Sequence, residues 1–247
     1  MENPFSLSGK SILVTGASSG IGRETAVLCA RMGARVIITG RNRERLGETY
    51  ASLPGDNHLQ IVADLTDAGQ RNQLVQDIHD LDGVAYCAGV WHRKPAKFMT
   101  EEDIAAVMRV NFDSVALLQS ALMSARRIRK GASLVFLSSK AADTPSTANA
   151  LYSASKGALI SYAKCLSLEL APRQVRVNCI LPAMVWTPLV IGQGLSEEDL
   201  REQEAKYPLK RFGRPEDIAN LAVFLLSDAS SWMTGTCIDI TGGAIEI

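Results

Sequence analysis

The chain has 247 residues, 47% of them hydrophobic, which suits one large α/β domain with a single buried core. Its 26 basic and 26 acidic residues give a formal net charge of zero. This balance argues against a nucleic-acid-binding protein, because the basic face of such a protein normally leaves an excess of positive charge.

Short apolar runs that predict strands alternate with amphipathic stretches that predict helices. In chain order we expect a strand at 10–15, a helix at 20–32, a strand at 35–39, a helix capped by Asn42, a strand at 59–63, a helix at 67–81 and a strand at 84–87. The next expected element is a helix from Thr100 to about residue 128, in which Asp103 completes a capping box with Thr100. It is followed by a strand at 134–137, a helix at 152–171 stopped by Pro172, a strand at 175–181, helices at 196–206 and 216–226 and a strand at 237–241.

Strands that alternate with helices predict βαβ units and therefore a parallel sheet covered on both faces. We expect an α/β fold with a doubly wound parallel sheet and with residues 1–247 forming one domain. The least regular stretch is 184–195, which follows a strand end, where such sheets place their ligand loops. It is interpreted as either a mobile lid or an ordinary surface loop.

The cysteines and the N-terminal segment indicate the cellular compartment in which the protein is expected. The five cysteines are widely spaced and include no C-x-x-C pair, so we expect no metal site and no redox pair. Residues 1–9 lack a secretory pattern and no apolar run reaches membrane-spanning length. The expectation is a soluble, cytoplasmic protein that binds neither membrane nor nucleic acid.

A glycine-rich turn, 15–22 (TGASSGIG), follows the first predicted strand and opens the first predicted helix. Glycine permits a tight bend and lets a pyrophosphate approach the backbone, and the positive end of the helix favours the phosphates. A dinucleotide site is therefore predicted; the alternative is that the glycines serve only helix–sheet packing. The contacts expected from this turn are Gly16, Ser18, Ser19, Gly20, Ile21 and Gly22.

The end of the second predicted strand should deliver the residue that binds the ribose, about 20 residues after the glycines. An NAD site usually has Asp or Glu here, whereas this chain has Arg41. A guanidinium suits a 2′-phosphate because it is planar, permanently charged and able to bind in bidentate fashion. We predict NADP(H), with Arg41 as the main contact and Thr39 or Arg43 as a second one; the alternative is that Arg41 merely begins a helix in solvent.

Tyr152 and Lys156 stand four residues apart on a predicted helix, so their side chains share one face. A free tyrosine has a pKa of about 10, and a nearby ammonium would lower that value by stabilising the phenolate. Tyr152 could then give its proton to a carbonyl oxygen as a hydride arrives, or take one from an alcohol in reverse.

Two further polar residues complete a candidate catalytic set. Ser139 ends the fifth predicted strand, where its hydroxyl could donate to a substrate carbonyl oxygen, and Ser138 is a competing candidate. Asn111 lies in the middle of a predicted helix, where asparagine is a poor helix former. Its amide could hold a water that relays protons from Lys156, or it could be a satisfied buried amide.

Together these pieces resemble the classical short-chain dehydrogenase/reductase family over nearly the whole chain. The matching positions are 15–22, Asp64, Ala88-Gly89, Asn111, Ser139, Tyr152-x-x-x-Lys156, Val177-Asn178, Pro182, Thr187, 213–217 (GRPED) and 238–243. The family's spacing of serine and tyrosine, 13 residues, selects Ser139 over Ser138.

The resemblance implies a seven-stranded Rossmann sheet and usually a homotetramer. It also implies further cofactor contacts, with Asp64 and Leu65 near the adenine, Lys156 on the nicotinamide ribose, Val185 and Thr187 near the carboxamide, and Ala88, Gly89, Tyr152 and Pro182 elsewhere along the site. Catalysis would then rest on Asn111, Ser139, Tyr152 and Lys156.

The chain departs from the family pattern in three places. Tyr86 and Cys87 stand where the family has two asparagines, so the end of that strand must be anchored differently. Ala183 replaces a glycine and restricts the backbone beside the expected nicotinamide. The connection from Asp64 to the fourth strand is a few residues short, so we expect a trimmed helix there.

Within the family the chain looks most like the reductases that act on 3-oxoacyl thioesters of acyl carrier protein in fatty acid biosynthesis. Segment 215–217 (PED) favours that group, and Lys130 and Arg173 match the positions at which such enzymes dock the carrier. The basic residues at 126–130 are interpreted as a solvated helix end or, alternatively, as a docking patch for an acidic partner.

Two other functions stay open from the residues. One is a dehydrogenase of a sugar, polyol, steroid or other small secondary alcohol. The other is an NADP(H)-binding sensor or scaffold without catalysis, which would not need the tyrosine, serine and asparagine together. The residues expected at the mouth of the pocket do not separate these alternatives: Trp91, His92, Met184 and Trp186. His92 is expected to be an ordinary loop residue.

Overall fold

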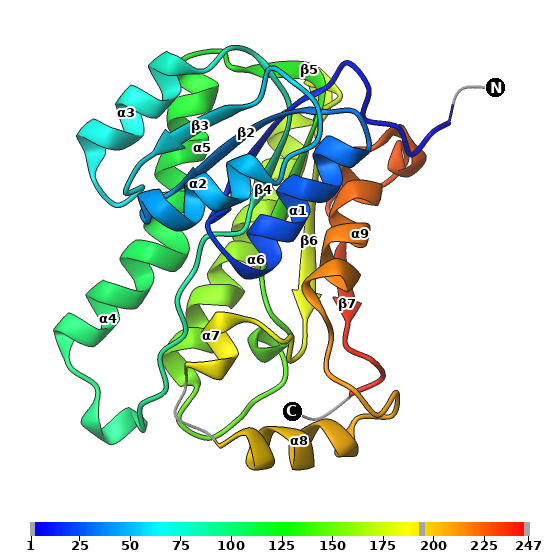
Figure 1. Ribbon diagram of the computed structural model, residues 1–247. Coiled ribbons are helices and arrows are strands. Elements are labelled where there is room, and N and C mark those ends of the chain that lie inside the picture. Colours follow the sequence, from blue (N-terminus) through cyan, green and yellow to red (C-terminus); the bar gives the residue numbers. More distant parts are fainter. Residues whose placement is uncertain (1–2, 193–195, 245–247) are drawn as a thin grey trace.

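A parallel sheet of seven strands, in the order β3-β2-β1-β4-β5-β6-β7, forms the centre of the computed structural model, which describes residues 3–192 and 196–244 (Figure 1). The strands are β1 (Ser11–Thr15), β2 (Arg35–Gly40), β3 (Leu59–Val62), β4 (Leu81–Tyr86), β5 (Ile128–Leu137), β6 (Arg176–Pro182) and β7 (Cys237–Ile240). The strand order reverses between β1 and β4, as in a doubly wound sheet. The predicted Rossmann-type architecture is confirmed.

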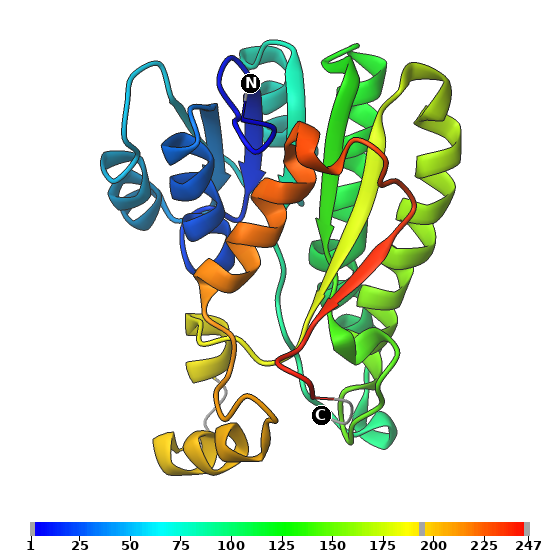
Figure 2. The same ribbon diagram turned by 90° about the vertical axis from the view of Figure 1, so that its right-hand side faces the viewer.

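Helices cover both faces of the sheet (Figures 1 and 2). On one face lie α1 (Gly20–Arg31), α2 (Arg43–Ala51) and α9 (Pro215–Leu226), and on the other lie α3 (Ala68–Asp77), α5 (Ser114–Ser124) and α6 (Ala150–Leu170). Each face has its own buried apolar cluster, and the pleat divides β1 between them: Ile12 and Val14 join the α1 side, while Leu13 joins the α6 side. Two buried faces explain why the strands are almost continuously apolar.

Local capping explains where several helices begin. The Asn42 side chain accepts a hydrogen bond from the backbone N–H of Arg45, and Thr100 and Asp103 form a reciprocal capping box at the start of α4 (Glu101–Met108). Both caps were predicted from the sequence.

The predicted helix at 100–128 and the strand boundaries after it were wrong. A π-helical turn, Arg109–Asp113, separates α4 from α5, which ends at Ser124. Arg126 then takes a left-handed conformation (φ 55°) and β5 begins at Ile128, six residues earlier than predicted. The first part of β5 is exposed and basic, so it lacks the apolar signal of a strand, and the basic residues at 126–130 do not end a helix.

The predicted helix at 67–81 also ends too late. Its last helical residue is Asp77, because Ile78 is already extended and Leu81 begins β4 beside Ile128 of β5. The helix is short, as the family comparison implied, with ten residues in α3.

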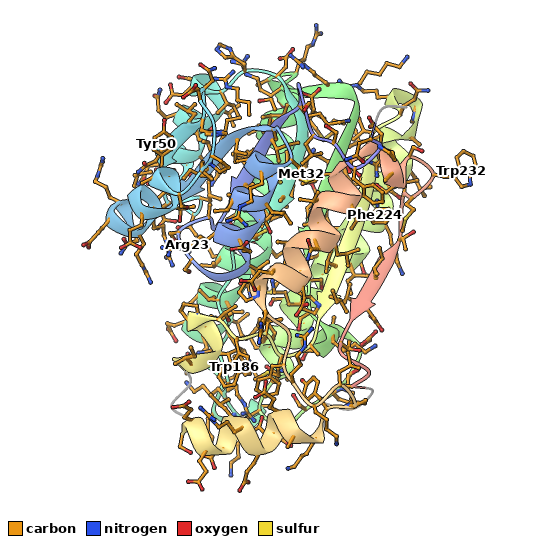
Figure 3. The ribbon with its side chains drawn as sticks, turned by 45° about the vertical axis from the view of Figure 1, so that its right-hand side comes forward. Arg23, Met32, Tyr50, Trp186, Phe224 and Trp232 are labelled. Atoms are coloured by element: carbon orange, nitrogen blue, oxygen red, sulfur yellow. The ribbon has the colours of Figure 1, made fainter. Side chains whose placement is uncertain are left out.

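Two short helices lie beyond the carboxyl ends of the strands (Figures 1 and 2). They are α7 (Pro188–Ile191), inside the stretch predicted to be irregular, and α8 (Glu197–Lys206), which was predicted to begin at Ser196, the residue that caps it. Trp186 lies between the sheet and α8 (Figure 3), where its indole N–H donates to Glu204 Oε1 at 2.9 Å. The part of the predicted lid or loop at 193–195 lies outside the described residues.

Over residues 3–192 and 196–244, none of the helices combines the length and apolar character that crossing a membrane requires. In the same part of the chain, no group of three or more His, Cys, Asp or Glu side chains is arranged to hold a metal ion.

Candidate active site

A cavity of about 510 Å³ opens at the carboxyl edge of the sheet, across the point where the strand order reverses. Open α/β sheets bind their ligands at this position. We call the part lined from segments 16–22, 40–45 and 63–66 the cofactor half, and the part lined from 90–93, 139–149 and 183–190 the substrate half. Apart from Asn111, all the predicted catalytic residues and main cofactor contacts line the cavity.

The glycine turn has the shape that a phosphate cradle needs. Gly16 and Gly20 have positive φ angles, 65° and 54°, which side chains rarely adopt. A Cβ at Gly22 would collide with the carbonyl oxygen of Gly16, and a Cβ at Gly16 would lie 2.8 Å from Ala88 Cα. The side chain of Ser19, the residue before α1, makes no capping hydrogen bond, so this helix N-terminus presents uncapped N–H groups. These features fit a bound pyrophosphate.

The ribose end of the cofactor half carries two arginines. Arg41 is exposed and lines the cavity together with Arg45 from the first turn of α2. Burial opposes ionisation of Asp64, but hydrogen bonds from Thr66 and the charge of Arg41 hold the pKa of Asp64 below its ordinary value. The arrangement fits an anion at the ribose.

The secondary contacts predicted beside Arg41 were misplaced. Thr39 is completely buried within β2, and Arg43 lies against a separate hollow beside β3. Arg45 lines the cavity instead of them, because α2 starts at Arg43 and the rotation of about 200° over two residues turns residue 45 toward the cavity. The Asn42 cap sets the register of α2, and this cap was the sequence signal from which the position of Arg45 could have been predicted.

Tyr152 and Lys156 meet at the middle of the cavity on the first turns of α6. Lys156 is 4% exposed, and its Nζ donates to the Leu137 carbonyl oxygen at 2.9 Å while lying 5.8 Å from the centroid of the Tyr152 ring. Gly89 leaves room for this amine, since a Cβ there would lie 3.2 Å from Nζ. Burial lowers the pKa of Lys156 to about 8.

The protein environment raises the pKa of Tyr152, opposite to the sequence prediction. Burial is the main cause, and a hydrogen bond between the Ser139 and Tyr152 side chains only partly opposes it. The ammonium of Lys156 does not offset this burial because it is bonded to Leu137 rather than to the phenol. At neutral pH Tyr152 therefore holds its proton.

The two candidate serines have different surroundings. Ser138 is 3% exposed, and its hydroxyl donates to the backbone carbonyl of Lys156 at 2.8 Å, which is a structural contact between β5 and α6. Both serines line the cavity, but Ser139 is the one whose side chain interacts with Tyr152, and its Oγ accepts from the backbone N–H of Ala141. The geometry favours Ser139 as the residue that faces a substrate.

Asn111 has the hydrogen bonds expected of a satisfied buried amide, which was the alternative interpretation. It is fully buried in the π-helical turn, and its Oδ1 accepts from Val90 N at 2.8 Å. Its Nδ2 donates to Val90 O and to Ser155 Oγ, both at 2.9 Å. With both amide N–H groups used, Asn111 fixes the loop after β4, and the predicted water-holding role finds no free donor. A π-turn at such a position is common near functional sites.

The departures from the family pattern have local explanations. Tyr86 is buried, stacks on Phe136 with ring centroids 4.6 Å apart and donates its hydroxyl to Gln119 Oε1. The Thr15 hydroxyl accepts from the backbone of Cys87 at 3.1 Å and so anchors the strand end in place of asparagine side chains. Burial raises the pKa of the Cys87 thiol to about 12, so the thiol stays protonated.

The structure divides the residues expected at the pocket mouth. Trp91 and Met184 line the cavity, whereas His92 lies 3.3 Å from Asp103 in a loop, as an ordinary loop residue does. Trp186 packs on Phe212 with ring centroids 5.3 Å apart. Among the lining residues that the sequence analysis did not predict are Arg93, Asn149 and Gln203, which belong to no recognisable motif.

The positions matched to carrier docking lie at the other end of the sheet. Lys130 belongs to the first residues of β5, and Arg173 precedes β6 and donates to the carbonyl of Ile128. The strands are parallel, and ten residues of β5 span roughly 33 Å. Lys130 lies seven residues before Leu137, which lines the cavity, so a carrier protein docked at Lys130 would be roughly 23 Å along the strand from the cavity of the same chain.

Comparison with known proteins gives a consistent picture. Residues 16–244 match the family described as Enoyl-(Acyl carrier protein) reductase. The chain is 35% identical over 245 residues to a 3-oxoacyl-acyl-carrier-protein reductase FabG of Aquifex aeolicus, covering 96% of this chain and 98% of that protein. It is 34% identical over 246 residues to the protein of the same name from Thermotoga maritima, covering 97% and 99%.

Solved structures agree with these relatives. A dehydrogenase/reductase from Sinorhizobium meliloti superposes with a TM-score of 0.87 at 32% identity, over 98% of this chain and 97% of that one. A proposed NAD(P)-dependent gluconate 5-dehydrogenase from Beutenbergia cavernae, solved with NADP bound, gives a TM-score of 0.87 at 31% identity, over 98% of both chains.

Proposed function

Because the chain belongs to the short-chain dehydrogenase/reductase family and is an oxidoreductase, we propose that it interconverts a carbonyl compound and a secondary alcohol with NADP(H). The observation that carries the proposal is the meeting of Ser139 and Tyr152 in the cavity, beside Lys156 and across from the glycine turn. A cofactor-binding sensor would need the turn alone.

The cofactor half supports NADP(H) in particular. The turn at 16–22 would hold the pyrophosphate, and Arg41 with Arg45 would hold a 2′-phosphate, where an NAD site would have a carboxylate. The Beutenbergia cavernae relative was solved with NADP, which supports the same choice. The cofactor, when bound, supplies or accepts the hydride.

The chain's own residues supply the proton and the polarisation. Ser139 would donate a hydrogen bond to the substrate carbonyl oxygen, which stabilises the charge that develops there. Tyr152 would transfer its hydroxyl proton to that same oxygen, and its raised pKa keeps the proton available for reduction at neutral pH. Lys156, with a pKa of about 8, would then stabilise or reprotonate the phenolate.

The substrate class proposed first is a 3-oxoacyl thioester, which the names of the curated relatives support. Together with this substrate class we propose a role in fatty acid biosynthesis, a cytoplasmic location and assembly as a homotetramer. For the last, exposed leucines on two helices offer apolar area: Leu117 of α5 is 50% exposed and Leu168 of α6 is 78% exposed. A small-alcohol, sugar, polyol or steroid dehydrogenase stays the alternative substrate assignment.

A panel of carbonyl compounds tests the proposal. The purified chain is mixed with NADPH and each compound in turn, including an acetoacetyl thioester, and the loss of NADPH absorbance is followed. Turnover with the thioester above that with simple ketones and ketoses supports the assignment. NADPH binding without oxidation by any compound would point to a sensor or scaffold instead.

A further inference from the structure

The substrate half of the cavity contains an exposed positive charge. The charged residues lining the described part of the cavity are Arg41, Arg45, Asp64, Arg93 and Lys156. The first three belong to the cofactor half, and Lys156 is buried against Leu137. Among the residues that the structure describes, Arg93 is therefore the exposed charged side chain that faces the substrate half, and the one lining carboxylate, Asp64, lies beside Arg41.

Hydrogen bonds fix Arg93 relative to the catalytic residues. The loop after β4 is joined to the segment that leads into α6: Trp91 Nε1 donates to Asn149 Oδ1 at 2.9 Å, and Lys94 N donates to Ala148 O at 2.8 Å. A guanidinium nitrogen of Arg93 donates to Thr147 O at 3.2 Å in the same segment. We call the two joined segments, 91–94 and 147–149, the clamp. Since Tyr152 follows three residues after Asn149, the clamp holds Arg93 in a fixed position relative to the phenol of Tyr152.

The backbone of the clamp supports a functional interpretation. Ala148 adopts a left-handed conformation with φ 62°, which is unfavourable for a residue with a side chain. Such strain persists where surrounding contacts impose it, and it collects at ligand sites.

Two lysines in the segments that line the substrate half are paired with carboxylates. Lys94 pairs with Asp103, and Lys140 pairs with Asp143 and Asp239. Within residues 3–192 and 196–244, no carboxylate pairs with Arg93, whose side-chain hydrogen bond goes to a neutral carbonyl. Most of its five donors stay available for a ligand.

We propose that Arg93 is a subsite for an anionic group of the substrate, a carboxylate or a phosphate, bound while Ser139 and Tyr152 hold the carbonyl. This inference rests on the proposed function and narrows its substrate class. A guanidinium binds either anion through two parallel hydrogen bonds, and it orients the ligand better than a point charge does. The anion comes either from an oxo acid or from the phosphates of a thioester's carrier arm.

Paired substrates separate the two sources and test the subsite. Acetoacetyl-coenzyme A is compared with the neutral thioester acetoacetyl-N-acetylcysteamine, and 5-ketogluconate is compared with the neutral ketohexose fructose. In Arg93→Gln, KM for the anionic member should rise about 10-fold, while kcat/KM for the neutral member changes less than about 2-fold. The pair that shows this difference identifies the source of the anion.

The matched control is Lys97→Gln. Lys97 is an exposed cation in the same connection that lies over the Phe98 ring and does not line the cavity, so this change should leave both members of each pair unaffected. If Arg93→Gln lowered kcat/KM equally for the charged and the neutral substrates, Arg93 would only hold the loop in place through its bond to Thr147. No change on any substrate would show that it does not touch them.

A binding measurement keeps the inference testable if turnover is absent. Protein saturated with NADPH is titrated by calorimetry with acetoacetyl-coenzyme A and with malonate. Binding of either that weakens about 10-fold in Arg93→Gln supports the subsite, and failure of both to bind the unaltered protein contradicts it. Absence of NADPH oxidation with every carbonyl would instead defeat the proposed function, so the two failures are distinct.

Discussion

The cofactor half and the substrate half of the cavity are held together by different kinds of contact. In the cofactor half the backbone forms the cradle, through two left-handed glycines, Gly22, where a Cβ would collide with a carbonyl oxygen, and an uncapped helix end. In the substrate half, side chains bridge two loops, as Trp91 does to Asn149 and Arg93 to Thr147.

This difference has a functional consequence. A backbone cradle tolerates few replacements and suits any dinucleotide, because its contacts go to the phosphates common to all of them. In a clamp made of side chains, one residue can be replaced at a time without altering the backbone of the cofactor half. Substrate choice can therefore vary within the fold while the cofactor site stays the same.

The largest effect should come from breaking the backbone cradle. In Gly22→Ala the new methyl group would overlap the Gly16 carbonyl, so NADPH binding should fall below detection and the midpoint of thermal unfolding should drop. The matched change is Gly157→Ala on α6, where a Cβ meets nothing within 4 Å. It should stabilise the protein by about 0.5–1 kcal/mol. Normal NADPH affinity in Gly22→Ala would refute the cradle.

A side chain sets cofactor choice within that half. Arg41→Asp places a carboxylate against the 2′-phosphate, so the dissociation constant for NADPH should rise about 100-fold while that for NADH stays equal or falls. Fluorescence titration measures both constants. Arg43→Asp is the control, since Arg43 lies outside the cavity, and it should leave both constants unchanged. Tighter binding of NADH than NADPH by the unaltered protein would overturn the assignment.

Lys156, at the border between the halves, should make stability depend on pH. Its folded-state pKa of about 8 lies below the ordinary 10.5, so between these values the unfolded chain binds more protons and folding gains stability as pH rises. Denaturant unfolding should show the wild type gaining about 1.5 kcal/mol relative to Lys156→Met between pH 8 and 9.5. A constant difference between the two proteins across this range would mean that the amine is not desolvated.

The smallest effect should come from the clamp in the substrate half. Asn149→Ala removes the acceptor of the Trp91 indole N–H, so KM for the carbonyl should rise about 5-fold while NADPH affinity stays the same. Asn149→Asp keeps an acceptor oxygen and should retain most of the affinity for the carbonyl. If NADPH affinity fell as much as carbonyl affinity did, the two halves would not be independent.

The cofactor half was also the better predicted of the two. Its signals are local: a glycine turn directly after an apolar strand, and Arg41 at the next strand end. Arg45 was not predicted as a lining residue because its position beside the cavity depends on the register of α2, which starts one residue after the Asn42 cap. Tyr152 and Ser139 were found through their spacing and place beside strand ends.

Other features depend on tertiary contacts that a single sequence does not display. The π-helical turn at Asn111 and the early start of β5 carry no apolar periodicity, so the helix at 100–128 was predicted too long. The direction of the Tyr152 pKa shift was wrong because burial, which cannot be estimated from spacing, outweighs the neighbouring amine. The bonds from Arg93 to Thr147 and from Trp91 to Asn149 join two segments that are more than 50 residues apart in the sequence.

The central claim is that Tyr152 provides the proton for carbonyl reduction, and Tyr152→Phe tests it most directly. With the panel compound that turns over fastest, kcat should fall about 1,000-fold while the dissociation constant for NADPH stays within about 2-fold. Tyr162→Phe on the same helix removes a hydroxyl outside the cavity and should keep full activity. If Tyr152→Phe retained kcat within about 10-fold of the unaltered enzyme, another group would have to supply the proton and the proposed mechanism would be wrong.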